Sequence, residues 1–265
     1  MELGLAGKIV LVTGGAKGIG EAISRSFAAE GAVPVIIGRN PDEAASIVSD
    51  LQSKGQKAVS RHAEMTDLAA LKSVADEILD SRGSIDVIVN NAAANDGVGL
   101  DAGPDAFRES LERNLVHVYA LQHYCLDALK ASRGNIVNIG SKVAETGQGG
   151  TSGYAAAKGG INALTREWAV DLARFGIRVN AVIPAEVMTP MYERWIQTLP
   201  NPEESLAQIT STIPLERRFT TAEEIADATV FVASSRSGHT TGQILYVDGG
   251  YTHFDRAATV RKMSN

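Results

Sequence analysis

The stretch that decides the fold is Thr13-Gly14-Gly15-Ala16-Lys17-Gly18-Ile19-Gly20. It follows the apolar run 8–13, which predicts a strand, and precedes 21–30, where apolar residues recur at helical spacing. Glycines permit a tight turn and let a pyrophosphate approach the backbone, while the amino end of the helix offers unpaired N–H groups. The pattern therefore predicts a dinucleotide-binding turn. A glycine-rich turn without a ligand is the alternative.

The alternation of short apolar runs with longer helical segments continues along the chain. It predicts strands at 33–37, 58–63, 85–89, 135–139, 177–182 and 244–247, and helices at 42–54, 68–81, 105–130 and 154–174. Strands that are apolar throughout fit a sheet covered on both faces, and strand–helix alternation implies right-handed crossovers. The expected fold class is α/β: a Rossmann-like, doubly wound parallel sheet of about seven strands with helices on both faces.

Composition is that of one globular domain. The chain has 265 residues, of which 44% are hydrophobic and 21% charged, and no Pro/Ser-rich linker divides it. We predict a single dinucleotide-binding and catalytic domain over residues 1–265. The segment 185–219 contains four prolines and no obvious strand, which favours a lid over the substrate. A surface excursion without function is the alternative.

Charge and residue usage exclude several classes of partner. The net charge of −6 argues against nucleic acid or an anionic membrane as the main partner. The first residues show no export signal, and no apolar run approaches the length of a membrane span, so we expect a cytoplasmic protein. The five histidines and the single Cys125 show no metal-ligand spacing, so no metal site is predicted.

The end of the second expected strand distinguishes the two nicotinamide dinucleotides. An acidic residue at this place accepts hydrogen bonds from the ribose 2′-hydroxyl, whereas a basic residue accommodates a 2′-phosphate. Here the sequence is Ile37-Gly38-Arg39-Asn40, with Arg39 and no acid. Lys17 in the glycine turn could supply a second cation to the same phosphate. NADP is therefore favoured and NAD remains possible; two solvated surface cations are the alternative reading.

Three residues form the chemical centre. Ser141 follows the fifth expected strand, at the sheet edge where ligands bind. Tyr154 and Lys158 are four residues apart and share one face of a helix. A nearby ammonium lowers the pKa of a phenol, so Tyr154 could act as a general base while the Ser141 hydroxyl holds the substrate oxygen. Taken alone, a Tyr–Lys pair at this spacing is usually exposed helix surface.

Together these motifs resemble the short-chain dehydrogenase/reductase family over nearly the whole chain. The glycine turn and Asn90-Asn91-Ala92 match two of its motifs, and Asn114, Ser141, Tyr154 and Lys158 match its catalytic tetrad. Asn180, Pro184 and Thr189 match the segment that holds the nicotinamide. Three places depart from the pattern: Ala93 replaces a glycine, Glu64 an aspartate, and Ala185-Glu186 stand where a glycine usually follows the proline.

The resemblance implies roles for individual residues. Tyr154 would be the base, Lys158 would tune its pKa and contact the ribose, and Asn114 would anchor a water in a proton relay. The implied cofactor contacts are Gly14, Lys17, Gly18, Ile19, Gly20, Arg39, Glu64, Met65, Asn91, Ala92, Tyr154, Lys158, Pro184, Val187 and Thr189.

Several less common segments look most like bacterial L-fucose dehydrogenases and related sugar dehydrogenases. They are 95–101, 146–149, 184–190 and 248–253. A polyhydroxylated sugar needs several polar partners, and Asn95, Gln148 and Glu186 are expected on loops beside Ser141 and Tyr154. Loop stabilisation is the alternative for each, and Glu186 could instead face solvent or pair with Arg194.

The expected reaction is oxidation of a sugar such as L-fucose at C1 to the lactone. Other family members with the same tetrad act on other alcohols and carbonyls, for instance 3-oxoacyl thioesters or steroids, so that reading stays open. A non-catalytic NADP-binding regulator is a third possibility, disfavoured by the intact tetrad.

The resemblance also implies a homotetramer in which the helices from about Asp105 and Tyr154 pack across an interface. The first of these helices carries apolar residues that could equally face the core of a monomer: Leu111, Leu115, Val118, Leu121 and Leu126.

Overall fold

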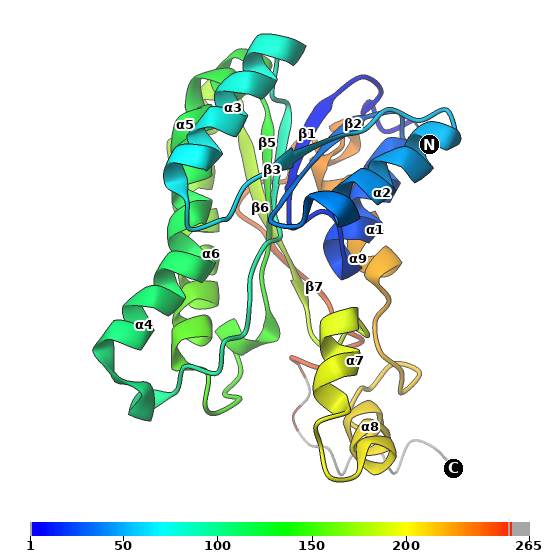
Figure 1. Ribbon diagram of the computed structural model, residues 1–265, viewed down its shortest axis with the longest axis vertical. Helices are drawn as coiled ribbons and strands as arrows, with labels where there is room; N and C mark the ends of the chain where they lie inside the picture. Colours follow the sequence, from blue (N-terminus) through cyan, green and yellow to red (C-terminus); the bar gives the residue numbers. More distant parts are fainter. Residues whose placement is uncertain (1, 254, 256–265) are drawn as a thin grey trace.

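A computed structural model describes residues 2–253 and 255 (Figure 1). Its centre is a seven-stranded parallel sheet with the strand order β3-β2-β1-β4-β5-β6-β7. The strands are β1 (Ile9–Thr13), β2 (Val33–Gly38), β3 (Val59–His62), β4 (Val87–Asn90), β5 (Asn135–Ile139), β6 (Arg178–Pro184) and β7 (Ile244–Val247). The expected doubly wound parallel sheet is confirmed.

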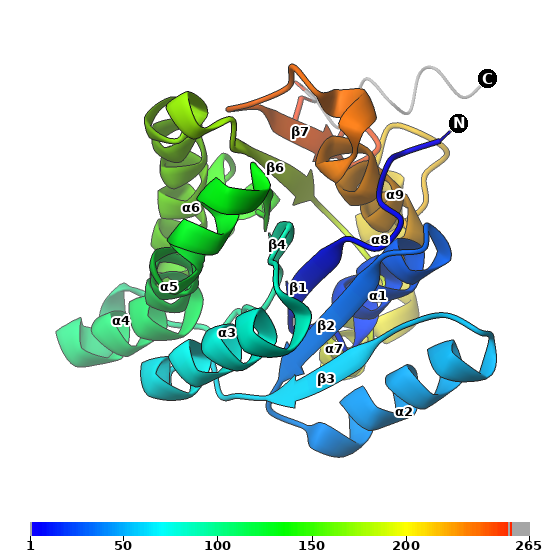
Figure 2. The ribbon, with the colours of Figure 1, turned by 90° about the horizontal axis from the view of Figure 1, so that it is seen from above.

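Helices cover both faces of this sheet (Figure 2). The α-helices are α1 (Gly18–Ala29), α2 (Pro41–Ser53), α3 (Leu68–Arg82), α4 (Gly103–Leu111), α5 (His117–Ser132), α6 (Ser152–Asp171), α7 (Pro190–Ile196), α8 (Pro202–Ser211) and α9 (Ala222–Ala233). Short 3-10 turns are η1 (Leu100–Ala102), η3 (Lys142–Ala144), η4 (Ala173–Phe175) and η5 (Ser235–Ser237).

The uniformly apolar strands are buried because their alternate side chains enter two different core layers. In β1, Ile9 and Leu11 pack in the layer built from α3, α5 and the end of α6. Val10 and Val12 face the opposite layer, which α1 and α9 close. A third cluster packs α2 against β2 and α1. Burial on both faces explains why these strands lack the alternation of a half-exposed sheet.

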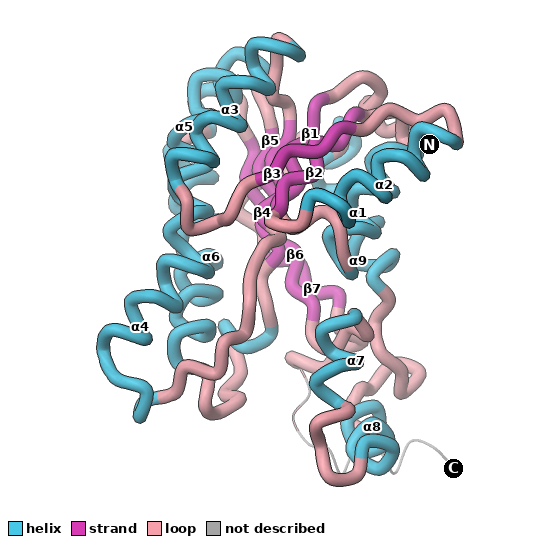
Figure 3. Tube along the Cα trace, viewed as in Figure 1, coloured by secondary structure: helices cyan, strands magenta, loops and turns pink. Residues whose placement is uncertain are grey.

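The long segments that follow β4, β5 and β6 leave the sheet at one end (Figure 3). All the strands are parallel, so their carboxyl ends meet there, together with α7 and α8 (Figure 1). This is the edge at which open α/β sheets bind their ligands.

The long helix expected over 105–130 is present over 103–132 and contains a π turn. A π-helical segment, η2 (Glu112–Val116), separates α4 from α5 and contains the buried Asn114. The backbone is helical through both junctions, so the prediction of one long helix is confirmed, whereas the π turn inside it was not predicted.

Two of the apolar residues considered for a tetramer interface face the chain's own core, which is the alternative that the sequence left open. Val118 and Leu121 are fully buried inside the chain's own core, so they are not available to another subunit. The outer faces of α5 and α6 instead expose Tyr119 and Val170, with exposed fractions of 56% and 80%.

The segment 185–219 contains two helices that its prolines begin. Pro190 and Pro202 occupy first-turn positions of α7 and α8, where the missing N–H costs nothing. An isolated parallel bridge between Val187 and Thr220 closes the base of the segment. In the described residues, no helix is long and apolar enough to cross a membrane.

Candidate active site

The glycine turn between β1 and α1 is compact. Gly14 and Gly18 have positive φ angles of 64° and 51°, which side-chain-bearing residues rarely adopt. A Cβ at Gly20 would overlap the carbonyl oxygen of Gly14, so the helix can begin this close to the turn only with glycine there. Lys17 is the N-cap of α1 and makes no side-chain capping bond, which leaves first-turn N–H groups for a ligand.

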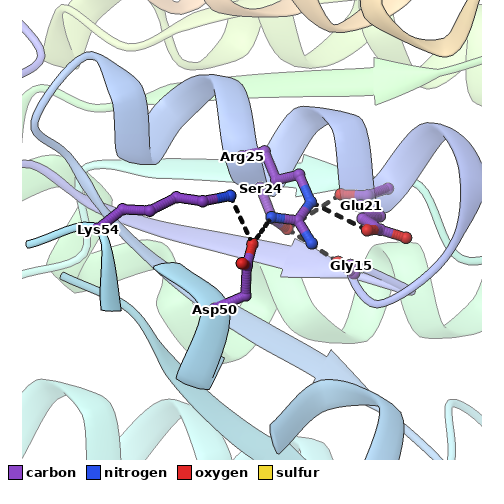
Figure 4. Close-up of polar contacts among 7 residues, drawn as sticks. Gly15, Glu21, Ser24, Arg25, Asp50 and Lys54 are labelled. Carbon is purple, nitrogen blue, oxygen red and sulfur yellow. Dashed lines mark hydrogen bonds and ion pairs between the residues drawn. The ribbon is translucent and has the colours of Figure 1, made fainter. Parts of the chain in front are cut away.

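Two neighbouring contacts hold this turn in place (Figure 4). Ser24 Oγ donates to the carbonyl of Gly15 at 3.0 Å and also contacts the carbonyl of Gly20 at 2.9 Å. On the outer side of α1, Arg25 bonds Glu21 and pairs with Asp50 of α2. Ser24 therefore anchors the turn to α1, and Arg25 joins α1 to α2.

Asn91 and Ala92 connect the end of β4 to the same turn. The Asn91 side chain donates to the carbonyls of Thr13 and Gly14 at 3.0 and 3.2 Å. The backbone N–H groups of Asn91 and Ala92 both donate to Thr13 Oγ1. Both residues lie beside the turn as expected, and the Asn91 amide acts there as a brace.

The residues expected near the adenosine ribose lie at the ends of β2 and β3. Arg39 is exposed directly after β2, and Glu64 is exposed after β3. Lys17 pairs with Glu43 in the first turn of α2. Met65 is buried in the α3 layer of the core. Lys17 thus already has a carboxylate partner, which makes Arg39 the stronger candidate for a 2′-phosphate.

The residues expected at the nicotinamide end follow β6. Pro184 is the last residue of that strand, and the Val187 side chain is buried in the α9 layer. Thr189 caps α7 by accepting from the N–H of Tyr192 at 3.3 Å. A Cβ on Gly18 would lie 3.1 Å from Thr189 Cγ2, so the glycine turn and the base of the 185–219 segment are adjacent.

Ser141, Tyr154 and Lys158 come together at the carboxyl end of β5. Ser141 begins η3, and its hydroxyl hydrogen-bonds the Tyr154 phenol. Lys158 Nζ donates to the carbonyl of Ile139 at 2.7 Å and lies 5.6 Å from the centre of the Tyr154 ring. The expected grouping of the three side chains is present.

The pKa of the phenol differs from the expectation. Burial raises the pKa of Tyr154 to about 12, and the hydrogen bond from Ser141 opposes this rise. Burial also lowers the pKa of Lys158 to about 8. The prediction that the ammonium holds the phenol below its ordinary pKa is wrong for this structure, because desolvation outweighs the other contributions.

Asn114 lies in the π segment and faces the loop after β4. Its Oδ1 accepts from the N–H of Ala94 at 2.8 Å, and its Nδ2 donates to the carbonyl of Ser110 at 3.0 Å. The side chain is therefore a brace between η2 and this loop. π turns of this kind frequently occur at functional sites.

Of the expected substrate residues, Asn95 and Gln148 are exposed, whereas Glu186 is buried. Asn95 is exposed, and its Oδ1 accepts weakly from the N–H of Gly97 at 3.4 Å, as in a local turn. Gln148 is exposed and lines a cavity of about 500 Å³ beside η3. Nothing in these contacts brings Asn95 to Tyr154.

Glu186 is buried and has partners that the sequence did not indicate. It forms an ion pair with Lys142, the residue after Ser141, and accepts a hydrogen bond from the Tyr192 hydroxyl. The alternative in which Glu186 faces solvent or pairs with Arg194 is wrong, since its side chain is only 10% exposed. The sequence analysis did not include Lys142 among the site residues, because its partner Glu186 lies in a different element. Its position next to Ser141 could have indicated that it lies near the site.

Comparison with known proteins identifies the family of this chain. A family model described as Enoyl-(Acyl carrier protein) reductase matches residues 14–252, which span the glycine turn, the tetrad and the segment after β6. The chain belongs to the short-chain dehydrogenase/reductase family. It is an enzyme of this class, and such enzymes bind a nicotinamide dinucleotide.

Relatives of this short-chain dehydrogenase act on different substrates. L-fucose dehydrogenase of Mus musculus is 34% identical over 96% of this chain and 92% of its own. The 3-oxoacyl-[acyl-carrier-protein] reductase of Thermotoga maritima is 35% identical over 93% of this chain and 98% of its own. The crystal structure of Cj0485 dehydrogenase matches with a TM-score of 0.92 and 43% identity, covering 97% of this chain and 98% of that one. The reaction type is shared, whereas the substrate differs among relatives.

The described residues fit the dinucleotide. The glycine turn leaves space and N–H donors for its pyrophosphate, and Thr189 adjoins that turn from the segment after β6. Ser141 and Tyr154 lie at the same end of the sheet, where the nicotinamide would meet a substrate. Within residues 2–253 and 255, no group of His, Cys, Asp or Glu side chains could hold a metal ion.

Proposed function

We propose that this enzyme oxidises the anomeric carbon of a pyranose such as L-fucose to its lactone, using NADP. The observation that carries the proposal is the buried Lys142–Glu186 ion pair, whose lysine directly follows Ser141 in the chain. An acyl chain or a steroid would leave these groups desolvated without new partners, at a cost of about 1–3 kcal/mol each. A sugar ring carries hydroxyls that can bond to both.

Ser141 and Tyr154 would orient the C1 hydroxyl between them. The Tyr154 oxygen takes the hydroxyl proton as the C1–O bond becomes a carbonyl, and the C1 hydrogen leaves as hydride. The dinucleotide, which the glycine turn and the adjoining Thr189 would hold, would supply the hydride acceptor, its nicotinamide ring. Burial lowers the pKa of Lys158 to about 8, so the neutral amine can take up the proton that the phenol releases as it accepts one from the C1 hydroxyl.

The preference for NADP rests on Arg39. It is exposed after β2, and Glu64 is exposed at the end of the adjacent β3. Since Lys17 is paired with Glu43, Arg39 would supply most of the charge for a 2′-phosphate.

Reduction of a 3-oxoacyl thioester is the second candidate. The 35% identity to the Thermotoga maritima reductase favours it as much as the 34% identity to mouse L-fucose dehydrogenase favours sugar oxidation. The polarity around Glu186 is what separates the two. A non-catalytic regulator is disfavoured because Ser141, Tyr154 and Lys158 are assembled.

A substrate panel tests the proposal. Aldoses, 3-oxoacyl thioesters and steroids are each assayed with NAD and NADP in both directions. We expect the highest kcat/KM for an aldopyranose with NADP, with the lactone as product. A higher kcat/KM for an acyl thioester would overturn the sugar assignment.

A further inference from the structure

A buried ion pair connects the catalytic turn to the segment after β6. Lys142 lies in η3, next to Ser141, and Glu186 lies two residues after the end of β6. Their side chains are only 14% and 10% exposed. Removing two charges from water is costly, so a pair kept at this depth needs further partners.

Two tyrosines enclose the pair. The Tyr192 hydroxyl, from α7, donates to the Glu186 carboxylate; burial and then this carboxylate raise the pKa of Tyr192. Lys142 Nζ lies 4.2 Å from the centre of the Tyr251 ring. An ammonium has three donors, and one of them is directed at Glu186. The pair therefore keeps hydrogen-bonding capacity that these two tyrosines do not use.

That remaining capacity faces a cavity. Lys142 and Tyr251 line the same space of about 500 Å³ as Gln148. Its other lining residues are small or hydroxylated: Thr146, Gly147, Thr212 and Thr252. The volume is in the range of small-molecule sites, and Lys142, which lines the cavity, directly follows Ser141 in the chain.

We propose that Lys142 determines substrate specificity by donating hydrogen bonds to ring hydroxyls remote from C1. This inference rests on the proposed function and adds a residue to it. Because Glu186 neutralises the ammonium, the site offers no net charge to attract an anionic substrate. An apolar substrate would leave the donors of Lys142 unpaired. The substrate class that fits is a neutral, polyhydroxylated ring.

The test compares two hemiacetals that differ only in ring substituents. L-fucose carries hydroxyls around its ring, whereas 2-hydroxytetrahydropyran has the anomeric hydroxyl alone. For Lys142→Met, we expect kcat/KM to fall roughly 10- to 100-fold on L-fucose and less than about threefold on 2-hydroxytetrahydropyran. Lys72→Met, which removes an exposed lysine of α3, should leave both values unchanged.

A second variant guards against loss of folding. Lys142→Met alone leaves Glu186 buried without its cation, so Lys142→Met/Glu186→Gln removes both charges together. Its melting temperature and its affinity for NADP report on the fold, and the same selective loss on L-fucose is expected.

The outcomes are distinct. An equal loss of kcat/KM on both hemiacetals would mean that Lys142 acts only through Ser141. No loss of kcat/KM would mean that Lys142 does not contact the substrate. Either result overturns this inference and leaves the proposed sugar oxidation unaffected. If the unaltered enzyme oxidises no pyranose, the proposed function fails and this inference fails with it.

Discussion

Tyr154 and Lys158 determine the pH at which the site can accept a proton. Burial places the pKa of Lys158 at about 8 and that of Tyr154 at about 12, so the pair loses its first proton near pH 8. Oxidation delivers a proton to this pair. We therefore expect kcat/KM for oxidation to rise as the pH increases through about 8 and then level off.

Lys158→Arg is the matched variant for this profile. A guanidinium keeps the positive charge but does not deprotonate in this range, so the rise near pH 8 should disappear. The measurement is kcat/KM for sugar oxidation from pH 6 to 10 in both proteins. A flat profile for the unaltered enzyme would contradict the assignment.

Arg39 is the residue on which cofactor preference depends. Arg39→Asp removes a partner of the 2′-phosphate and adds an acceptor for a 2′-hydroxyl. The ratio of kcat/KM with NADP to that with NAD should fall roughly 10- to 100-fold. Arg82→Asp, at an exposed position ending α3, is the control. An unchanged ratio for Arg39→Asp would mean that this side chain is ordinary surface.

Some contacts and pKa values of single residues could be predicted from the sequence, and others could not. The approach of Ser141 to Tyr154 and Lys158 followed from a strand end and a helical spacing. The partner of Glu186 could not be predicted from the sequence, because Lys142 lies 44 positions away and no local pattern joins the two. The raised pKa of Tyr154 depends on burial, which the sequence around it does not reveal.

At the scale of elements, α5 begins with a buried histidine. Burial lowers the pKa of His117 to about 4, and the Lys158 ammonium adds to this effect. The unfolded chain binds a proton at this residue below about pH 6.5, whereas the folded chain does not until about pH 4. As the pH falls through this window, His117 therefore reduces the free energy of unfolding, by up to about 3 kcal/mol.

Urea unfolding of His117→Gln measures this contribution. The difference in free energy of unfolding between the unaltered protein and the variant should shift by about 3 kcal/mol between pH 7 and pH 4. His239→Gln, at an exposed position, is the control variant. If the free energies of unfolding of the unaltered protein and of His117→Gln changed equally with pH, the pKa of His117 would not be lowered by folding.

Elements were predictable where periodicity is regular. The strands were found because they are short apolar runs between helical segments. The π segment at Asn114 was not, because apolar residues continue on both sides of it and the composition does not change. Helices α7 and α8 were not predicted, although Pro190 and Pro202 mark their first turns.

At the scale of the whole molecule, we predict a homotetramer in which the outer faces of α5 and α6 are buried. Tyr119 and Val170 are exposed there, and the Tyr119 ring lies 6.4 Å from that of Trp168. Light scattering should give about four times the chain mass of 28.0 kDa. Val170→Glu should produce smaller species, whereas Leu79→Glu on α3 should not. A 28.0 kDa monomer at micromolar concentration would refute the assembly.

The doubly wound architecture was predictable as a whole because the central strands, β1, β2, β4, β5 and β6, are mostly apolar on both faces. Such strands require two helical layers, and these in turn bring every strand's carboxyl end to one edge. What that edge binds depends on residues such as Lys142 and Tyr251, which come from opposite ends of the chain's second half. The resemblance suggested a sugar as substrate, whereas the contact of Lys142 with Tyr251 could be found only in the assembled structure.

The most direct test follows the hydrogen on C1 of the sugar. L-fucose deuterated at C1 is incubated with the enzyme and NADP, and the reduced dinucleotide is analysed by mass spectrometry. We predict one deuterium in the reduced nicotinamide and L-fuconolactone as the product, with no reduced dinucleotide formed by Tyr154→Phe, which lacks the proton-accepting oxygen. Reduced dinucleotide without deuterium, or undiminished turnover by Tyr154→Phe, would contradict oxidation at C1 by this site.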